Sequence, residues 1–202
     1  MSLFDKFADV AKARADLDRA EIPPVATPID AVHSATEGTI GGRRVILAGT
    51  NNYLGLTLDP DVVESARRAL SEQGTGTTGS RMANGSYANH AALERDLADA
   101  WGWPSAMVFS TGYQANLGAI SALAGKDDFL LLDSDSHASI YDGARLGHAQ
   151  TVIFRHNDPA NLDRRLARLG ENAKRALIVV EGLYSMMGDQ PPLEDFIEVK
   201  NR

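Results

Sequence analysis

The hydrophobic positions at the start of the chain follow a helical spacing. Leu3, Phe7, Val10 and Ala11 recur at intervals of three or four residues, which predicts an amphipathic helix over residues 3–20. The two prolines at 23–24 should end this helix, because proline lacks the backbone N–H that the next turn requires.

A β-ribbon is predicted after this helix. Gly41 and Gly42 separate two short runs of strand-forming residues, 39–40 and 45–48, and a pair of glycines suits a tight hairpin turn. We therefore expect residues 1–55 to form an arm made of a helix and a β-ribbon, and residues 56–202 to form a larger domain.

Helical patterns and short apolar runs alternate along the rest of the chain. Strands that alternate with crossover helices are typical of a largely parallel α/β sheet with both faces covered. The glycine-rich stretch 74–85 follows a helix and lacks a P-loop lysine, so we interpret it as a hydroxyl-rich loop and not as a nucleotide site. The predicted helices cover residues 60–70, 87–101, 114–124, 139–146, 159–169 and 193–202, and the predicted strands cover 106–109, 129–133, 151–154 and 176–180.

The composition narrows the possible functions. With 202 residues and 44% hydrophobic content, the chain can bury a substantial core. A formal net charge of −7 disfavours broad binding to nucleic acid or anionic membrane. We find no apolar run of about 18 residues and no secretion signal, so we expect a cytoplasmic protein without a transmembrane segment. The absence of cysteine excludes disulfides and thiolate metal ligands.

Polar residues follow three of the predicted strands. Gly112 and Tyr113 open a helix whose free backbone N–H groups could bind a phosphate, although an ordinary helix cap is the simpler interpretation. His137 follows the second strand, and Glu181 and Ser185 follow the last one. Because ligands collect at the carboxyl ends of parallel strands, we expect these residues to share one edge of the sheet.

The other histidines carry no comparable signal. His90, His148 and His156 each lack a second ligand at helical spacing, so we expect no metal site. We interpret all three as structural or solvent-facing residues.

Five motifs, taken in order, resemble those of the α-oxoamine synthases: Asn52-Tyr53-Leu54-Gly55 and the segments 74–85, 109–116, 133–140 and 181–189. This resemblance implies a fold-type I pyridoxal-phosphate enzyme, here with an incomplete and mostly parallel sheet flanked by helices. Such enzymes condense an amino acid with an acyl thioester and release carbon dioxide.

Within the family, residues 137–143 are most similar to the bacterial serine palmitoyltransferases. That similarity implies L-serine and a long-chain acyl-CoA as substrates, in sphingolipid-type biosynthesis. Glycine or alanine as amino donor and an acyl carrier protein as acyl donor stay open. A parent enzyme resembling 8-amino-7-oxononanoate synthase, 2-amino-3-ketobutyrate ligase or 5-aminolevulinate synthase also stays open.

The resemblance assigns roles to four residues around pyridoxal 5′-phosphate. His137 matches the histidine that stacks on the pyridine ring and helps to orient the substrate. The backbone of Gly112 and Tyr113 matches the site of the cofactor phosphate, in agreement with the helix-terminus argument. Ser185 matches a serine near the phenolic oxygen of the cofactor.

Three further residues match positions that contact the substrates. Asn52 matches an asparagine near the substrate carboxylate. Ser80 and Arg81 belong to a loop that lies near the acyl-thioester entry and the dimer interface in the family, so the resemblance also implies a homodimer.

Two catalytic motifs of the family do not occur in this sequence. One supplies the aspartate that pairs with the pyridine nitrogen, and the other supplies the lysine that forms the Schiff base with the cofactor. We therefore expect the chain to be the N-terminal portion of a synthase and to be inactive in isolation. The alternative is a short, non-catalytic protein that binds a ligand or a partner. None of the lysines fits the covalent role: Lys6, Lys12, Lys126, Lys174 and Lys200.

Overall fold

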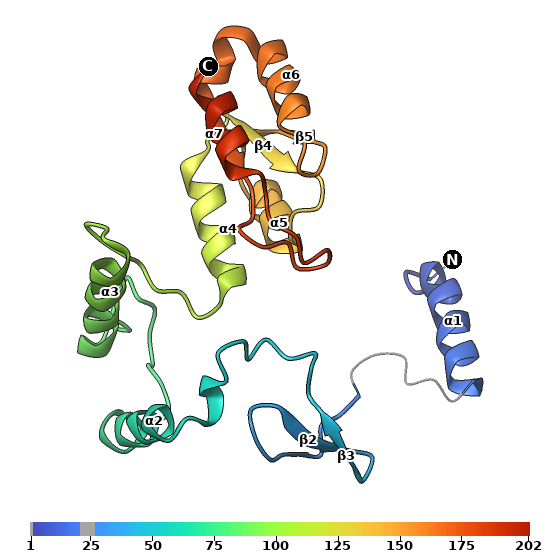
Figure 1. The fold of residues 1–202 in the computed structure, drawn as a ribbon, viewed down its shortest axis with the longest axis vertical. Coiled ribbons are helices and arrows are strands. Elements are labelled where there is room, and N and C mark those ends of the chain that lie inside the picture. The colour runs from blue at the N-terminus through green and yellow to red at the C-terminus, as the bar shows by residue number, and fades with distance from the viewer. Residues whose placement is uncertain (1, 21–26) are drawn as a thin grey trace. The chain divides into compact units, whose positions relative to one another are not determined.

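The computed structural model describes residues 2–20 and 27–202, so the predicted helix stop at 23–24 lies outside the described residues. The chain divides into two compact units, of which the first ends at Gly85 and the second is Ser86–Arg202. Each unit is described separately below, and most of the helices and strands are labelled in Figure 1.

The first unit begins with the predicted helix. A short 3₁₀ helix, η1 (Asp5–Phe7), leads into α1 (Ala8–Arg19), and the apolar residues of this segment are exposed except Leu17, which is half-buried. A three-stranded antiparallel sheet follows, with β1 (Ala31–Val32), β2 (Glu37–Ile40) and β3 (Arg43–Ile46) in that order. Gly41 and Gly42 form the turn between β2 and β3 with φ angles of 56° and 74°, which glycine adopts without strain.

The remainder of the first unit contains a capped helix and the glycine-rich loop. A 3₁₀ helix, η2 (Leu56–Leu58), precedes α2 (Pro60–Gln73). Asp59 caps α2 as predicted, because its Oδ1 accepts from the backbone N–H groups of residues 61 and 62 at 3.0 and 3.2 Å. In the loop, a Cβ at Gly85 would lie 1.8 Å from the carbonyl oxygen of Gly79, so only glycine fits there.

The second unit contains a three-stranded parallel sheet in the order β5-β4-β6. Its strands and helices lie close to the predicted ones: α3 (Ala88–Trp101), α4 (Gly112–Leu123), β4 (Phe129–Asp133), α5 (Ala138–Leu146), β5 (Gln150–Phe154), α6 (Pro159–Leu169), η3 (Gly170–Arg175), β6 (Ala176–Val179) and α7 (Leu193–Asn201).

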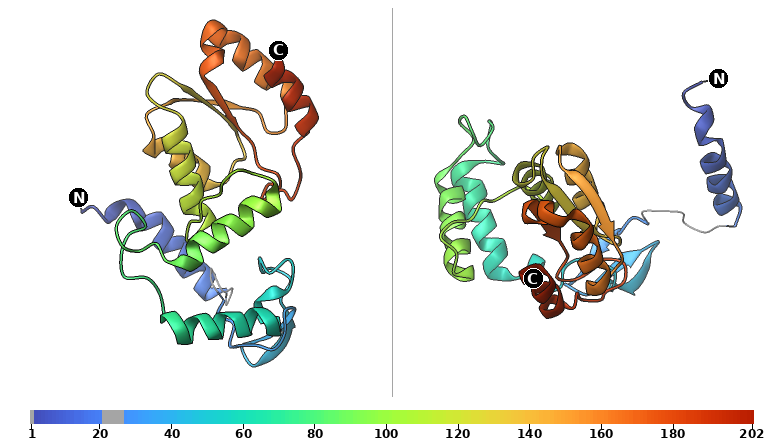
Figure 2. Two further views of the ribbon diagram at one scale, coloured as in Figure 1. Left: turned by 90° about the vertical axis from the view of Figure 1, so that its left-hand side faces the viewer. Right: turned by 90° about the horizontal axis from the view of Figure 1, so that it is seen from above.

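The core of this unit has two layers, one on each face of β4. Leu130 and Leu132 pack with Ile120 of α4 and with Ile140 and Ala144 of α5. On the opposite face, Leu131 packs with side chains from β5, α6 and α7: Phe154, Leu162, Phe196 and Val199. Figure 2 shows α6 and α7 side by side next to the sheet. Successive side chains of a strand point to opposite faces of the sheet. The successive leucines of the buried β4 strand therefore lie in different layers.

The predicted strand at 106–109 is wrong. These residues form no ladder with another strand in the described parts of the chain. Instead, the backbone N–H of Val108 donates to Oε1 of Glu94 in α3 at 3.0 Å. A run of apolar residues becomes a strand only where a neighbouring strand supplies backbone partners, and here a side chain takes up the N–H.

Candidate functional site

The carboxyl ends of β4, β5 and β6 lie at one edge of the second unit's sheet. All pairings are parallel, with Asp133 opposite Phe154 and with Leu132 opposite Val179. The segments that leave these strands therefore start from the same edge, as the sequence predicts.

The start of α4 presents backbone N–H groups. Thr111 caps this helix, because its Oγ1 accepts from the N–H of Gln114 at 3.1 Å. The amides of Gly112 and Tyr113 precede that bond in the first turn, where no carbonyl of the helix can reach them. A Cβ at Gly112 would meet no atom within 4 Å, so a bound group could approach this backbone closely. The helix end is suited to an anion.

The Tyr113 side chain ties the start of α4 to α5. Its hydroxyl donates to Oδ2 of Asp142, and Nη1 of Arg145 donates to Oδ1 of the same carboxylate at 2.8 Å. The hydrogen bond with Asp142 raises the pKa of Tyr113, and burial adds to this rise. The same bond is the largest cause that lowers the pKa of Asp142, and the hydrogen bond from Arg145 is the next largest.

His137 is the residue that caps α5. Its Nδ1 accepts from the backbone N–H of Ser139 at 3.2 Å and lies 2.7 Å from the Ser139 hydroxyl. Its own backbone N–H donates to Oε1 of Glu181, in the segment after β6, at 2.5 Å. The residue itself is exposed. His137 therefore connects the segments that follow β4 and β6.

Ser185 lies exposed in a tight loop between β6 and α7. The N–H of Tyr184 donates to the carbonyl oxygen of Asp189 at 2.9 Å, and the N–H of Gly188 donates to that of Tyr184 at 2.8 Å. Gly188 has a φ of 69°, which favours glycine. Tyr184 is only 1% exposed and anchors the loop beneath Ser185.

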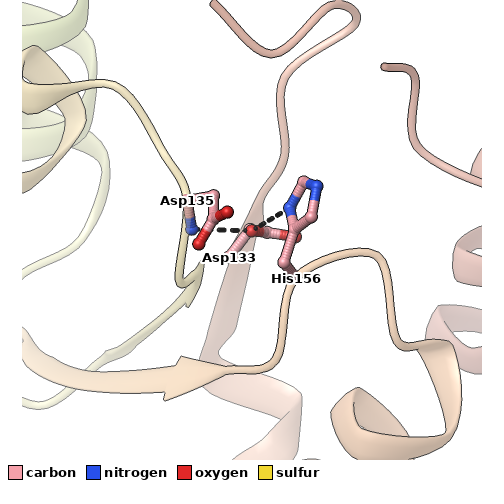
Figure 3. A group of neighbouring side chains, drawn as sticks. All are labelled: Asp133, Asp135 and His156. Carbon is pink, nitrogen blue, oxygen red and sulfur yellow. Dashed lines mark hydrogen bonds and ion pairs between the residues drawn. The ribbon is translucent and has the colours of Figure 1, made fainter. Parts of the chain in front are cut away.

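The His156 ring lies between the carboxylates of Asp133 and Asp189. Figure 3 shows its contact with Asp133. Its Nδ1 lies 2.8 Å from Oδ1 of Asp133, and its Nε2 lies 2.9 Å from Oδ2 of Asp189. The neighbouring Asn157 donates its backbone N–H to Asp133 at 2.9 Å and its Nδ2 to Asp189 at 3.0 Å. The Tyr184 ring and the imidazole pack in a T-shaped arrangement, with ring centroids 4.5 Å apart. These contacts join the segments after β4, β5 and β6.

The two carboxylates change the titration of His156. Burial lowers the pKa of His156, but the hydrogen bonds to Asp133 and Asp189 outweigh burial and raise it. The hydrogen bond from His156 is the main reason that the pKa of Asp189 is lowered.

The same corner brings three potential metal ligands together. Ligand atoms of Asp133, Asp135 and His156 lie within 4.8 Å of one another. However, His156 is at hydrogen-bond distance from Asp133, which also accepts from the Asp135 N–H at 2.9 Å. These bonds already account for the closeness of the three residues (Figure 3), so the cluster gives no separate indication of an ion.

Asn52, Ser80 and Arg81 belong to the first unit. Oδ1 of Asn52 accepts from the N–H of Thr57 at 3.4 Å, and the carbonyl oxygen of Ser80 accepts from two backbone N–H groups of its loop, at 2.8 and 3.0 Å. Ser80 and Arg81 are exposed. Their predicted approach to the substrates stays a prediction.

Sequence reasoning missed the residues that hold the site together. Asn116, Ser139, Asp133 and Asp189 were not singled out, and His156 was set aside as structural or solvent-facing. One available signal was unused: His156 follows β5 at the carboxyl edge of the sheet, which is the criterion that selected His137.

Comparisons with known proteins agree with this architecture. Serine palmitoyltransferase from Caulobacter vibrioides is 54% identical over 200 residues, which are 99% of this chain and 50% of that protein. An 8-amino-7-oxononanoate synthase from Methylobacterium nodulans is 44% identical over 159 residues, 79% of this chain and 42% of that protein. The chain thus spans about half the length of the curated relatives that it matches.

A solved structure extends the similarity to the fold. A serine palmitoyltransferase variant from Sphingomonas paucimobilis, with a bound PLP–myriocin aldimine, superposes with a TM-score of 0.95 at 46% identity. The match covers 100% of this chain and 50% of that one. It confirms the expected fold class, an incomplete α/β fold of the fold-type I pyridoxal-phosphate enzymes, and the resemblance to bacterial serine palmitoyltransferases.

Two further findings concern membrane spans and family membership. Among the residues that the structure describes, no helix is long and apolar enough to cross a membrane. The family model for aminotransferases of class I and II matches residues 43–202. A match over that much of the sequence establishes that the chain belongs to the aminotransferase class I and II family.

Proposed function

We propose that this chain provides the cofactor-binding edge of a pyridoxal-phosphate-dependent acyltransferase that condenses L-serine with a long-chain acyl-CoA. The observation that carries the proposal is the linkage along one sheet edge. Hydrogen bonds connect α4 to α5 through Tyr113 and Asp142, and connect His137 to the segment after β6 through Glu181. The similarity to serine palmitoyltransferases supports the choice of substrates.

The residues present fit pyridoxal phosphate. The amides of Gly112 and Tyr113 at the start of α4 would hold the phosphate, and the open space at Gly112 lets the phosphate approach. The exposed His137 would stack on the ring, and Ser185 would lie near the phenolic oxygen. When bound, the cofactor supplies an electron sink for the α-carbon of the amino acid.

The role of this chain in the reaction is to bind and orient. Asn52 would hold the substrate carboxylate, and Ser80 and Arg81 would line the entry of the acyl thioester. The intact protein would act as a homodimer in the cytoplasm, in sphingolipid-type biosynthesis, and bind no metal.

We also propose that residues 1–202 alone do not complete the reaction. In the second unit, Lys126 precedes β4 and Lys174 precedes β6, so both lie at the amino edge of the sheet. Lys200 lines a cavity together with Lys174 and Ala176, at the start of β6. These positions support our proposal that none of the three amines forms a Schiff base at the carboxyl edge. Measurable turnover by the isolated chain would refute this part of the proposal.

The assignment of the reaction is tested by spectroscopy on the intact protein. We expect its visible absorption to change when L-serine is added, and to change less with glycine or L-alanine. A response to L-alanine without a response to L-serine would replace L-serine as the amino donor, and would favour a parent nearer to the 8-amino-7-oxononanoate synthases, to which the chain is also similar. A response to glycine alone would also replace L-serine as the amino donor.

The role of His137 is tested in the same assay. His137→Ala should slow condensation by roughly tenfold or more and alter the cofactor spectrum, because the imidazole proposed to stack on the cofactor ring is lost. His148→Ala, which changes an exposed histidine between α5 and β5, is the matched control and should behave like the unmodified protein. Unchanged turnover and spectrum in His137→Ala would contradict the stacking role.

A further inference from the structure

The His137 ring is held from one side by a short chain of polar groups. Nδ1 receives the backbone N–H of Ser139 at 3.2 Å and lies 2.7 Å from the Ser139 hydroxyl. That hydroxyl in turn lies 2.9 Å from Nδ2 of Asn116, a residue of α4. Ser139 is 0% exposed, so water does not compete for these contacts.

The direction of each hydrogen bond in this chain follows from one fixed donor. A backbone N–H can only donate, so the bond from Ser139 requires a lone pair on Nδ1 of His137. With Nδ1 as an acceptor, the Ser139 hydroxyl must also donate to it at 2.7 Å. The hydroxyl oxygen is then left to accept, which matches the amide nitrogen of Asn116 as its neighbour. The opposite direction would place Nδ1–H against the backbone N–H of Ser139, with two donors facing each other.

Helix packing keeps the members of this chain together. α4 and α5 approach closely at Gly143, where a Cβ would lie 3.0 Å from the carbonyl oxygen of Asn116 and 3.1 Å from Cβ of Ile120. Asn116 and Ser139 therefore meet across a close helix crossing, where a larger residue at position 143 would force its neighbours to shift.

We propose that Asn116 and Ser139 are positioning residues that keep the proton of the neutral His137 ring on Nε2. The consequence for catalysis rests on the proposed function: the ring presents an N–H donor to the ligand side, which suits an acceptor such as the carboxylate of the amino acid substrate. The identity of the tautomer itself depends only on the contacts of this chain.

The tautomer can be measured directly by NMR. The full 202-residue chain is labelled with ¹⁵N-histidine, and long-range ¹H–¹⁵N spectra are recorded at about pH 8.5. These spectra report which ring nitrogen carries the proton in each neutral imidazole. His148 is exposed and serves as the reference in the same sample. The ratio of Nε2–H to Nδ1–H at His137 should exceed the ratio at His148 by roughly tenfold. An equal ratio, or a predominant Nδ1–H form, would overturn the proposal.

A substitution that reverses one donor provides a sharper test. Asn116→Asp keeps the shape of the side chain but replaces the donor with an acceptor, so the Ser139 hydroxyl should turn toward it and Nδ1–H should gain population. Gln150→Glu makes the same chemical change at an exposed position of β5 and should leave the His137 ratio unchanged. An Asn116→Asp variant in which the ratio of Nε2–H to Nδ1–H at His137 is unchanged would refute the role proposed for Asn116.

Ser139 provides a test by loss and rescue. Ser139→Ala should move the His137 ratio toward that of His148, because only the backbone donor remains, and Ser139→Thr should restore it by returning the hydroxyl. A ratio that Ser139→Ala leaves unchanged would count against the proposal. The unmodified chain decides the question alone if a variant fails to fold. The NMR readout also needs no turnover. A failed activity assay on the intact protein would reject the proposed function while leaving the tautomer of His137 measurable.

Discussion

The surroundings of His137 and His156 differ although both residues leave the same edge of one sheet. In the described part of the chain, the hydrogen bonds to the His137 ring all reach Nδ1, and the residue is exposed. Both nitrogens of His156 meet carboxylates, and its side chain is only 19% exposed. The imidazole of His137 thus keeps one nitrogen for a ligand, whereas that of His156 is fully used within the protein.

This difference agrees with the role in chemistry that we propose for His137, whereas the contacts of His156 hold the fold together. His156 holds together three segments that start from different strands, with Asp133 on one side and Asp189 on the other. Its contacts fix the loop that carries Ser185, because Asp189 also accepts the N–H of Tyr184. Both histidines follow a strand, so their position does not distinguish them. They differ because Nε2 of His137 has no hydrogen-bond partner in the described part of the chain, whereas both ring nitrogens of His156 have one.

The largest effect should follow removal of the buried carboxylate beside His156. Asp133 is 0% exposed and accepts from three groups: Nδ1 of His156 and the backbone N–H groups of Asp135 and Asn157. Asp133→Ala should lower the free energy of unfolding by about 3 kcal/mol, because three donors lose the buried carboxylate that accepts from them. Urea denaturation monitored by circular dichroism measures this change.

Asp135→Ala is the matched control for that prediction. Asp135 is exposed, and its bond to Asp133 uses the backbone N–H, which the substitution keeps. Its cost should stay below about 0.5 kcal/mol. If both substitutions lower the free energy of unfolding by the same amount, the hydrogen bonds that the Asp133 carboxylate accepts do not stabilise the fold as the contacts indicate.

A smaller effect is expected on the His137 side of the comparison. Gly143→Ala would place a Cβ 3.0 Å from the carbonyl oxygen of Asn116, which forces α4 and α5 apart. Overpacking costs about 1–3 kcal/mol, and the better helix propensity of alanine offsets up to about 1 kcal/mol, so the net loss should be about 1 kcal/mol. The tautomer ratio of His137 should fall at the same time, whereas the contacts of His156 should persist.

Gly182→Ala provides the control for this substitution. A Cβ at Gly182 would meet no atom within 4 Å, so the variant should unfold at the same urea concentration as the unmodified chain. A Gly143→Ala variant that is as stable as this control would show that the helix crossing can relax.

Local signals explain which parts of the fold were predictable from the sequence. The cap at Asp59, the turn at Gly41 and Gly42, and the buried run of β4 depend on neighbouring residues, and the structure confirms them. Residues 106–109 carry the same apolar signal as β4, but a strand also requires a partner strand, which a local pattern does not specify.

The candidate site divides in the same way. His137 and the start of α4 could be found because each follows an apolar run and belongs to a motif. The contact of Asn116 with Ser139 joins residues 23 positions apart, and the contact of His156 with Asp189 joins residues 33 apart. Such pairs depend on helix crossings and loop closures that the hydrophobic pattern does not encode, so their roles became visible only in the fold.

The smallest expected effect is a pH dependence of stability that comes from His156 and its partner Asp189. A raised pKa means that the contribution of His156 is fully present below its unfolded pKa of about 6.5 and is lost as the pH rises through its folded pKa. The lowered pKa of Asp189 means that its contribution is present above about 3.9 and is lost as the pH falls through its folded pKa. Asp133, Asp135 and Tyr184 also face the ring.

His156→Gln should therefore lose the most stability, relative to the unmodified chain, between about pH 4 and 6.5, and progressively less toward about pH 9. The pH-dependent part should stay below about 1 kcal/mol, because solvent screens the partly exposed pair with Asp189. Urea denaturation across this range, repeated with Asp189→Asn and with the double variant, isolates the interaction of the two residues. A difference between His156→Gln and the unmodified chain that is constant with pH would mean that the charge on the imidazole does not contribute to stability in this range, which would contradict the raised pKa of His156.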